Sequence, residues 1–285
     1  MIQSMTGYGK TVLQLETKKV TIEVKSLNSK NLDLNVRIPA YYREKELAIR
    51  KRLATFLERG KIDFSIYIEE TGEKLSTKIN HSVVNLYIDQ LREIVDGDAT
   101  ELLKMALRMP DTLKTEREEL DQDEWKHIET TIGETIAKIV EYRSDEGAVL
   151  EADFVKRITI IRNVLQEVIA IDPDRITAVK ERLQKGIEEL KTKVDENRFE
   201  QELVYYIEKY DITEEKVRLE NHLDYFIKEL AGKGSNGKKL GFISQEIGRE
   251  INTIGSKANY APMQKMVVQM KDELEKIKEQ NLNVL

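Results

Sequence analysis

The spacing of apolar residues changes once along this chain, and that change constrains the fold more than any other feature. Early in the chain, apolar and polar residues alternate with a period of two in segments that predict half-buried strands: Thr11–Glu16, Lys19–Leu27, Asn31–Ile38 and Lys61–Glu69. From Asn80 onward the strand signal disappears, and apolar residues recur every three or four positions, as on one face of a helix. The sequence therefore predicts an α+β protein: an N-terminal antiparallel sheet with one helix between Pro39 and Lys61, and then a helical remainder.

The helical remainder contains a predicted hairpin. Apolar residues step by three and four over 150–168 and again over 176–194, which indicates two long amphipathic helices. Asp172 can cap the second helix and Pro173 can occupy its first turn, so we expect the two to fold back as an antiparallel pair. Such an arm is more typical of assembly than of substrate contact. Three more helices are expected at about 201–230, 240–257 and 262–282.

These elements predict an order of domains. Residues 1–75 form the sheet-and-helix part of an N-terminal domain, and residues 76–145 continue that domain as helices. Residues 146–200 form the long antiparallel hairpin, and residues 201–285 form a C-terminal helical domain.

Composition narrows the chemistry. No apolar run approaches the ~20 residues needed to cross a bilayer, and the N-terminus lacks the apolar core of a signal peptide, so we expect a cytoplasmic protein without a membrane partner. The chain has no cysteine, which excludes thiolate nucleophiles and cysteine-bound metals. Any metal must therefore use oxygen ligands and the three histidines.

The charge is unevenly distributed. Residues 1–60 hold twelve Lys and Arg against six Asp and Glu, or +6, so the net charge of −6 leaves −12 for the rest. A polyanion would approach the N-terminal part. A solvated basic face beside an acidic helical body explains the same numbers.

One group of polar residues falls on the helix expected from residue 212 to 230. Glu215 and His222 lie two turns apart on one flank of its apolar stripe, where they could bind a metal or carry protons. The alternative is that His222 has a structural role only and forms a hydrogen bond beside the core. Asp211 with Glu214 resembles a capping box, whose role is to start the helix.

A second group falls on the helix expected over 240–257. Glu246, Glu250 and Lys257 lie within about 60° of one another beside a stripe of isoleucines, and Arg249 lines the next sector. A carboxylate as close to that stripe as Glu250 needs a cation, a donor or a metal. A structural salt-bridge network with Arg249 or Lys257 is the competing interpretation.

Together the two groups predict a site for Mn²⁺ or Mg²⁺ with ligands Glu215, His222, Glu246 and Glu250. Such an ion activates water or supports the charge that grows on a phosphodiester. Cationic side chains beside it would steady the phosphate oxygens. The predicted catalytic residues are Glu215, His222, Glu246, Arg249, Glu250 and Lys257.

Further side chains are predicted to bind RNA: Arg37, Arg43, Lys61, Arg218, Lys238, Lys239 and Asn252. Tyr8, Tyr41 and Tyr42 are available for base stacking, although tyrosines in such a domain more often pack in the core or at its rim. The run from Gly232 to Lys238 matches most of a phosphate-binding P-loop. Because Lys239 stands where Ser or Thr should hold magnesium, and a helix leads into the run, we expect no nucleotide cofactor.

Several stretches resemble the YicC/YloC family. The N-terminal likeness is carried by Ser4–Gly9, Glu23–Lys30, Leu32–Leu34, Arg37–Pro39 and Arg59–Lys61. The C-terminal likeness is carried by Asp211–Glu215, Arg218-Leu219, His222-Leu223 and Gln245–Lys257, and the central one by Arg143, Glu146, Gly147 and Leu150. The likeness is weakest over about 70–135, where the segment Glu116–Glu124 is more acidic than expected of the family.

The resemblance implies a cytoplasmic bacterial endoribonuclease that depends on a divalent metal, manganese or magnesium. It also implies a ring-like homohexamer that acts on single-stranded RNA, including small regulatory RNAs. Two alternatives stay open. One is a non-catalytic RNA-binding adaptor, in which the charged rows hold an assembly together, and the other is an oligomeric helical scaffold with no affinity for RNA.

Overall fold

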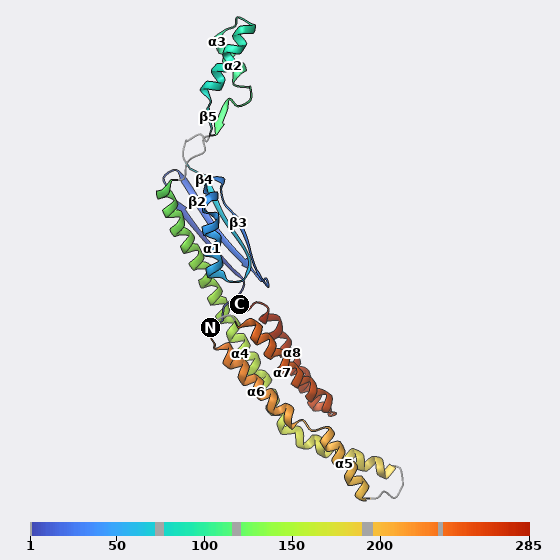
Figure 1. Ribbon diagram of the computed structural model, residues 1–285. Coiled ribbons are helices and arrows are strands. Elements are labelled where there is room, and N and C mark those ends of the chain that lie inside the picture. Colours follow the sequence, from blue (N-terminus) through green and yellow to red (C-terminus); the bar gives the residue numbers. More distant parts are fainter. Residues whose placement is uncertain (1, 72–76, 116–120, 190–195, 233–235) are drawn as a thin grey trace.

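The molecule is elongated along a single long helix, α4 (Gln122–Glu189) (Figure 1). The computed structural model describes residues 2–71, 77–115, 121–189, 196–232 and 236–285. A four-stranded sheet lies against the first half of α4 and a helical bundle against a later part, while the two chain ends meet between them (Figure 1). The predicted α+β class is confirmed. No helix in the described ranges is long and apolar enough to span a membrane.

The sheet has the strand order β1-β2-β4-β3, from β1 (Gly7–Gln14), β2 (Lys18–Leu27), β3 (Leu32–Arg37) and β4 (Gly60–Glu70). Three strands are antiparallel neighbours, but β3 runs parallel to β4, so the sheet is mixed rather than purely antiparallel. The connection between β3 and β4 explains why the purely antiparallel sheet predicted from the sequence is wrong. The 3-10 helix η1 (Ala40–Lys45) and helix α1 (Glu46–Leu57), the single helix expected here, carry the chain back before β4 begins, as a parallel crossover requires.

The two-residue alternation selects one buried face of the sheet. Val20, Ile22 and Val24 of β2, with Ile62 and Phe64 of β4, are almost fully buried. They form one core with α1 and with the part of α4 between residues 125 and 139. The opposite face of the sheet carries the polar residues of the same strands and is solvent-accessible. This is the arrangement that the alternation predicts.

Helix α4 passes through Pro173, so the hairpin turn predicted at Asp172-Pro173 is wrong. Asp172 does not cap a new helix. Its buried carboxylate accepts hydrogen bonds from Arg175 Nε at 2.7 Å and Lys216 Nζ at 2.8 Å. These bonds hold the helix onto its neighbours around the proline, whose ring normally breaks a helix. The chain returns along the end of α4 only with α5 (Glu196–Lys209) (Figure 1), and the predicted domain boundary at residue 146 falls inside α4.

The bundle consists of α4 with α6 (Thr213–Leu230), α7 (Gly237–Lys257) and α8 (Ala261–Asn281). The last two match the expected helices at about 240–257 and 262–282. The helix expected at 201–230 is divided into α5 and α6. The division lies at Asp211, whose carboxylate accepts from the Thr213 N–H at 3.1 Å and hydroxyl at 2.7 Å. These local bonds start α6, as a capping interpretation of Asp211 predicts, and they lower the pKa of its carboxyl.

A small unit at one end of the molecule, which we call the tip module, comprises residues 77–115 (Figure 1). It contains β5 (Thr77–Ile79), α2 (His81–Ile94), α3 (Ala99–Ala106) and β6 (Leu113–Thr115), and β5 pairs with β6. The prediction of helix alone after Asn80 is therefore wrong for β6. A strand of three residues is too short to show a two-residue period.

The N-terminal segment crosses α4 between the sheet and the bundle. Buried Arg143 of α4 donates hydrogen bonds to the carbonyl oxygens of Met5, Leu57 and Arg59 and to the Ser26 hydroxyl. Burial lowers the pKa of this guanidinium, and the four acceptors replace part of the water that it loses, although its Nε has no partner among the described residues. The chain end joins the same place, since the Leu285 N–H donates to the Gln3 carbonyl at 2.9 Å.

Gly147 is required where the N-terminal segment crosses α4. A Cβ at this buried position would overlap the Ile2 carbonyl group, whereas a Cβ at Gly186 in the same helix would meet nothing within 4 Å. We therefore expect Gly147→Ala to lower the free energy of unfolding by at least ~1 kcal/mol, although alanine favours a helix. The matched change Gly186→Ala should raise it by about 0.5–1 kcal/mol. Urea unfolding followed by circular dichroism measures both, and equal effects would contradict the close crossing.

Candidate active site on helices α6 and α7

Helices α6 and α7 pack side by side as an antiparallel pair. Two ion pairs fix their register. Glu215 near the start of α6 meets Lys257 at the end of α7, with Oε1 and Nζ 2.8 Å apart, and Glu229 near the end of α6 meets Lys239 near the start of α7, also at 2.8 Å. The two polar flanks that the sequence predicts, one on each helix, therefore converge within a single chain.

Glu215 is buried, and its two oxygens differ. Oε1 accepts from Lys257 Nζ, which also donates to the Asp211 carbonyl at 2.8 Å. Oε2 is buried and has no hydrogen-bond partner within the described ranges. A buried carboxylate with one free oxygen can accept a further donor or a cation.

His222 lies midway between the two ion pairs on α6, and Glu250 lies between them on α7, nearer to Lys257. His222 is seven residues after Glu215, and Glu250 is seven residues before Lys257, so the antiparallel register places them at the same level. Glu250 is only 5% exposed, and the described residues give it no hydrogen bond or ion pair. His222 is half-buried. The two oxygens of Glu250 are not among the fully enclosed unpaired atoms of the described residues, so a cation can reach this carboxylate from solvent.

The polar residues on the more exposed side of α7 resemble those of a usual protein surface. Glu246 is half-buried and Arg249 is exposed, with 3.9 Å between the guanidinium and carboxylate atoms. Asn252 is also exposed. The competing salt-bridge interpretation therefore describes Glu246 with Arg249, and Glu215 with Lys257, but not Glu250.

The four predicted metal ligands do not form a complete set in one chain. Among the residues that the structure describes, no three His, Asp or Glu side chains are grouped so that they could hold one ion. The ion pair with Lys257 accounts for part of this, because it already occupies one oxygen of Glu215. A metal bound here would take at most two of the predicted side chains from one chain.

The predicted RNA-binding residues fall into two groups. Arg37, Arg43 and Lys61 are exposed on the sheet and on η1. The second group, Arg218, Lys238, Lys239 and Asn252, lies on the bundle. Lys238 is exposed, Lys239 is paired with Glu229, and Arg218 is paired with Glu214 at 2.5 Å.

One member of each group, Lys61 and Lys238, lies near the junction of sheet and bundle. The turn before β3 contacts the chain end, because the Asn28 side-chain amide donates to the Leu282 carbonyl at 2.5 Å. The chain end in turn contacts the start of α7, since the Gly237 N–H donates to the Leu285 carbonyl at 3.2 Å. Lys61 begins β4 beside that turn, so Lys61 and Lys238 lie on opposite sides of the same junction.

The tyrosines divide into packed and exposed side chains. Tyr42 is buried and donates a hydrogen bond to Glu124, and burial raises the pKa of its hydroxyl, so it cannot stack on a base. Tyr41 is half-buried against Tyr42. Tyr8 is exposed on the open face of the sheet, where Lys25 Nζ lies over its ring. Sequence reasoning missed Tyr67, an exposed ring on the same face, whose position in the alternation of β4 marks it as outward-facing.

The described residues on either side of the segment 233–235 do not have the fold of a P-loop. Residues 233–235 lie outside the described residues, but helix α6 leads into this segment and Gly237 begins α7. A P-loop instead follows a strand.

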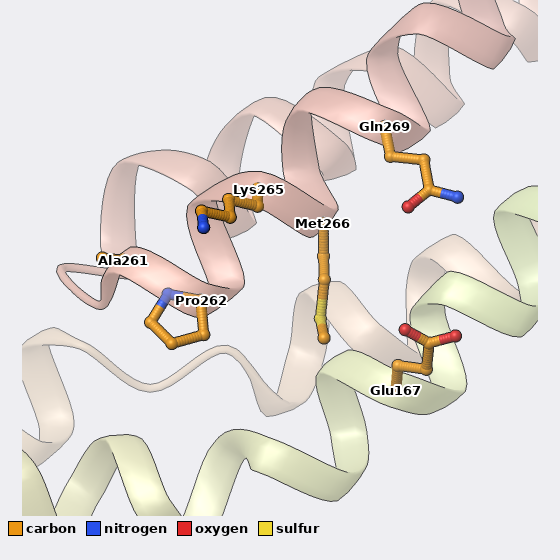
Figure 2. Close-up of a pocket in the computed structure, with 6 residues that line it drawn as sticks. All are labelled: Glu167, Ala261, Pro262, Lys265, Met266 and Gln269. Carbon is orange, nitrogen blue, oxygen red and sulfur yellow. The ribbon is translucent and has the colours of Figure 1, made fainter.

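A pocket of about 410 Å³ between α4 and α8 contains none of the predicted site residues (Figure 2). It is lined by Glu167, Ala261, Pro262, Lys265, Met266 and Gln269. Figure 2 shows Met266 pointing from α8 toward α4, with Glu167 on the facing helix. No unpaired buried charge lies among these residues, so the chemistry favours the contact between α6 and α7, which we call the groove, as the candidate site.

We predict that Lys257→Met destabilises the fold by about 2 kcal/mol or more, because it leaves the buried Glu215 carboxylate without its cation. The double change Glu215→Gln with Lys257→Met should recover much of the loss. Lys278→Met, which removes an exposed ion pair with Glu275, is the matched control and should change stability by less than about 0.5 kcal/mol. A double variant no more stable than Lys257→Met would contradict this account.

Comparisons with known proteins identify relatives along the whole chain. Residues 2–152 match the family described as "Endoribonuclease YicC-like, N-terminal region", and residues 168–285 match "Endoribonuclease YicC-like, C-terminal". A protein of Clostridioides difficile named "Probable endoribonuclease YicC" is 32% identical over the full length of both chains. A protein of the same name from Haemophilus influenzae is 28% identical, again over both full lengths. The chain therefore belongs to the YicC-like endoribonuclease family.

Proposed function

We propose that this chain is a cytoplasmic endoribonuclease that cleaves single-stranded RNA, including small regulatory RNAs, with the help of Mn²⁺ or Mg²⁺. We further propose that it works as a homo-oligomer, a hexamer by family resemblance. The names of its full-length relatives support cleavage of RNA. The groove between α6 and α7 is the proposed site.

One observation carries the choice of site: Glu250 is buried, has no partner in the described part of the chain, and lies at the level of His222. A group that only stabilises the fold is expected to be paired when it is buried. Buried carboxylates without a partner are instead typical of places where a protein binds or transforms a ligand. The carboxylate and the imidazole are also the side chains that most often transfer protons in enzymes.

The donor set fits a hard divalent ion that keeps much of its water. Mg²⁺ usually takes only one or two protein carboxylates and retains several waters, so it does not need three protein ligands from one chain. Glu250, with His222, Glu246 or the free oxygen of Glu215, would hold the ion. When bound, it would lower the pKa of a water or offset charge on a phosphate.

The other residues of the groove would act on the RNA itself. His222 would accept or donate a proton at the reacting oxygens, and Lys257 and Arg249 would contact phosphate oxygens. Lys61 and Lys238, on either side of the junction, would guide the strand toward the groove. The overall charge is negative, so these local cations decide where a polyanion can approach.

A non-catalytic RNA-binding adaptor is the second candidate. The ion pairs Glu215–Lys257 and Glu229–Lys239 favour it, since both are explained by helix packing alone. The adaptor gives no reason for the burial of Glu250.

We predict that Glu250→Gln and His222→Ala each lower the rate of cleavage of a single-stranded RNA on the order of 100-fold or more, the range typical of a lost acid or base. Glu275→Gln, at an exposed position of α8, is the matched control and should keep the full rate. Gel-based cleavage assays give the rates, and light scattering gives the mass of the assembly. Unchanged rates in both variants would remove the proposed site, whereas loss of the assembly would support the salt-bridge interpretation.

We also predict that EDTA abolishes cleavage and that added Mn²⁺ or Mg²⁺ restores it, because the Glu250 carboxylate has no counter-ion and one oxygen of Glu215 has no donor. RNA binding, measured by fluorescence anisotropy with the same RNA, should survive chelation through Lys61 and Lys238. Cleavage that persists in EDTA would refute metal dependence. Binding without cleavage under all metal conditions would favour the adaptor.

A further inference from the structure

The tip module has too little core for its size. Within residues 77–115, the largely buried side chains are Val84, Leu102, Ala106 and Thr112. The sheet of the module has only two strands of three residues, and an isolated two-stranded ribbon is marginally stable in water. A domain of about 40 residues usually needs disulfides, a metal or association with another chain, and this chain has no cysteine.

Apolar side chains are instead concentrated on the surface of the module. It exposes nine large hydrophobic residues, out of 28 such residues in the described chain: Ile79, Leu86, Ile94, Val95, Leu103, Met105, Leu107, Met109 and Leu113. Ile94, at the end of α2, is 81% exposed. Four of the nine lie on α2 and α3, and the other five lie on β5, on β6 and in the turns between elements. Nine such side chains in a unit of 39 residues exceed the scattered single residues of an ordinary surface, and a concentration of this kind is typical of an interaction site.

The other described segments of the same chain do not cover this surface. The module stands beyond the sheet, and its helices and strands pack chiefly on one another (Figure 1). The sheet core ends on α1 and α4 and does not include the module. A partner must therefore come from another molecule.

The charge of the module favours a protein partner over RNA. It has five basic residues, Lys78, Arg92, Lys104, Arg108 and Lys114, and six acidic ones, Asp89, Glu93, Asp96, Asp98, Glu101 and Asp111, so its net charge is −1. A surface for RNA carries an excess of positive charge. Two nearly neutral copies of one apolar surface can approach each other without repulsion.

We propose that the tip module is an interface between copies of this chain, in which the apolar side chains of α2 and α3 from neighbouring copies pack on one another. The inference rests on the proposed homo-oligomer and specifies which part of the chain builds it. The site on α6 and α7 is distant from this interface (Figure 1), so assembly and chemistry can be tested separately.

The absence of cysteine in the chain allows a direct test. Ile94→Cys in the tip module and Leu47→Cys in α1 introduce thiols at positions of equal exposure, 81% and 79%. In the assembled full-length protein, maleimide should modify the thiol of Ile94→Cys at least tenfold more slowly than that of Leu47→Cys. On dilution to monomers the two rates should become similar. Equal rates in the assembled protein would overturn the proposal, and so would a wild-type chain that is monomeric at all concentrations.

A second test uses Leu86→Glu with Ile94→Glu, and Leu47→Glu as the control. Both positions in the module are exposed, so the charges should leave the monomer folded by circular dichroism. Light scattering should show a smaller species for the double variant and an unchanged mass for the control. An unchanged mass in the double variant would overturn the proposal. If the wild-type protein assembles through the module but does not cleave RNA, the interface stands and the proposed function fails.

Discussion

The structure depends on the close crossing of the N-terminal segment over α4. This helix contributes residues 125–139 to the core of the sheet and residues 154–168 to the core of the bundle, and Arg143 and Gly147 lie between the two. Gly147 allows the backbone of Ile2 to approach the helix, and Arg143 donates to three carbonyl oxygens, one in the N-terminal segment and two where α1 leads into β4. Since one helix serves both cores, this crossing sets the position of the sheet relative to the candidate site.

The local part of this architecture could be predicted from the sequence. The alternation in β2 and β4 and the three-to-four spacing in α7 and α8 depend only on which side chains face a core. The direction of β3 depends on where α1 returns the chain, and next to Pro173 the continuous helix α4 is joined to α6 by Asp172 and Lys216. Both are contacts between segments distant in sequence, which periodicity does not record.

The same distinction applies to the candidate site. The helix periodicity placed Glu215, His222 and Glu250 beside the apolar stripes, and the structure confirms that α6 and α7 meet along these flanks. The pairing of Lys257 with Glu215 required the register of the two helices, and it left Glu250 as the unpaired group. The burial of Tyr42 likewise depends on Glu124 and Trp125 of α4, far along the chain.

The arrangement of charges explains how the groove can keep a buried carboxylate without a partner. Ion pairs lie at both ends of the α6–α7 contact, and on its other side Gly248 and Gly255 let α7 approach Leu274 and Val267 of α8. Helix α7 is therefore held from two directions and cannot easily shift to expose Glu250. The cost of burying that charge is offset by the packing of the whole bundle, so it remains available to a ligand that supplies positive charge. A site of this kind is rigid before its ligand arrives, which favours binding because little order is lost.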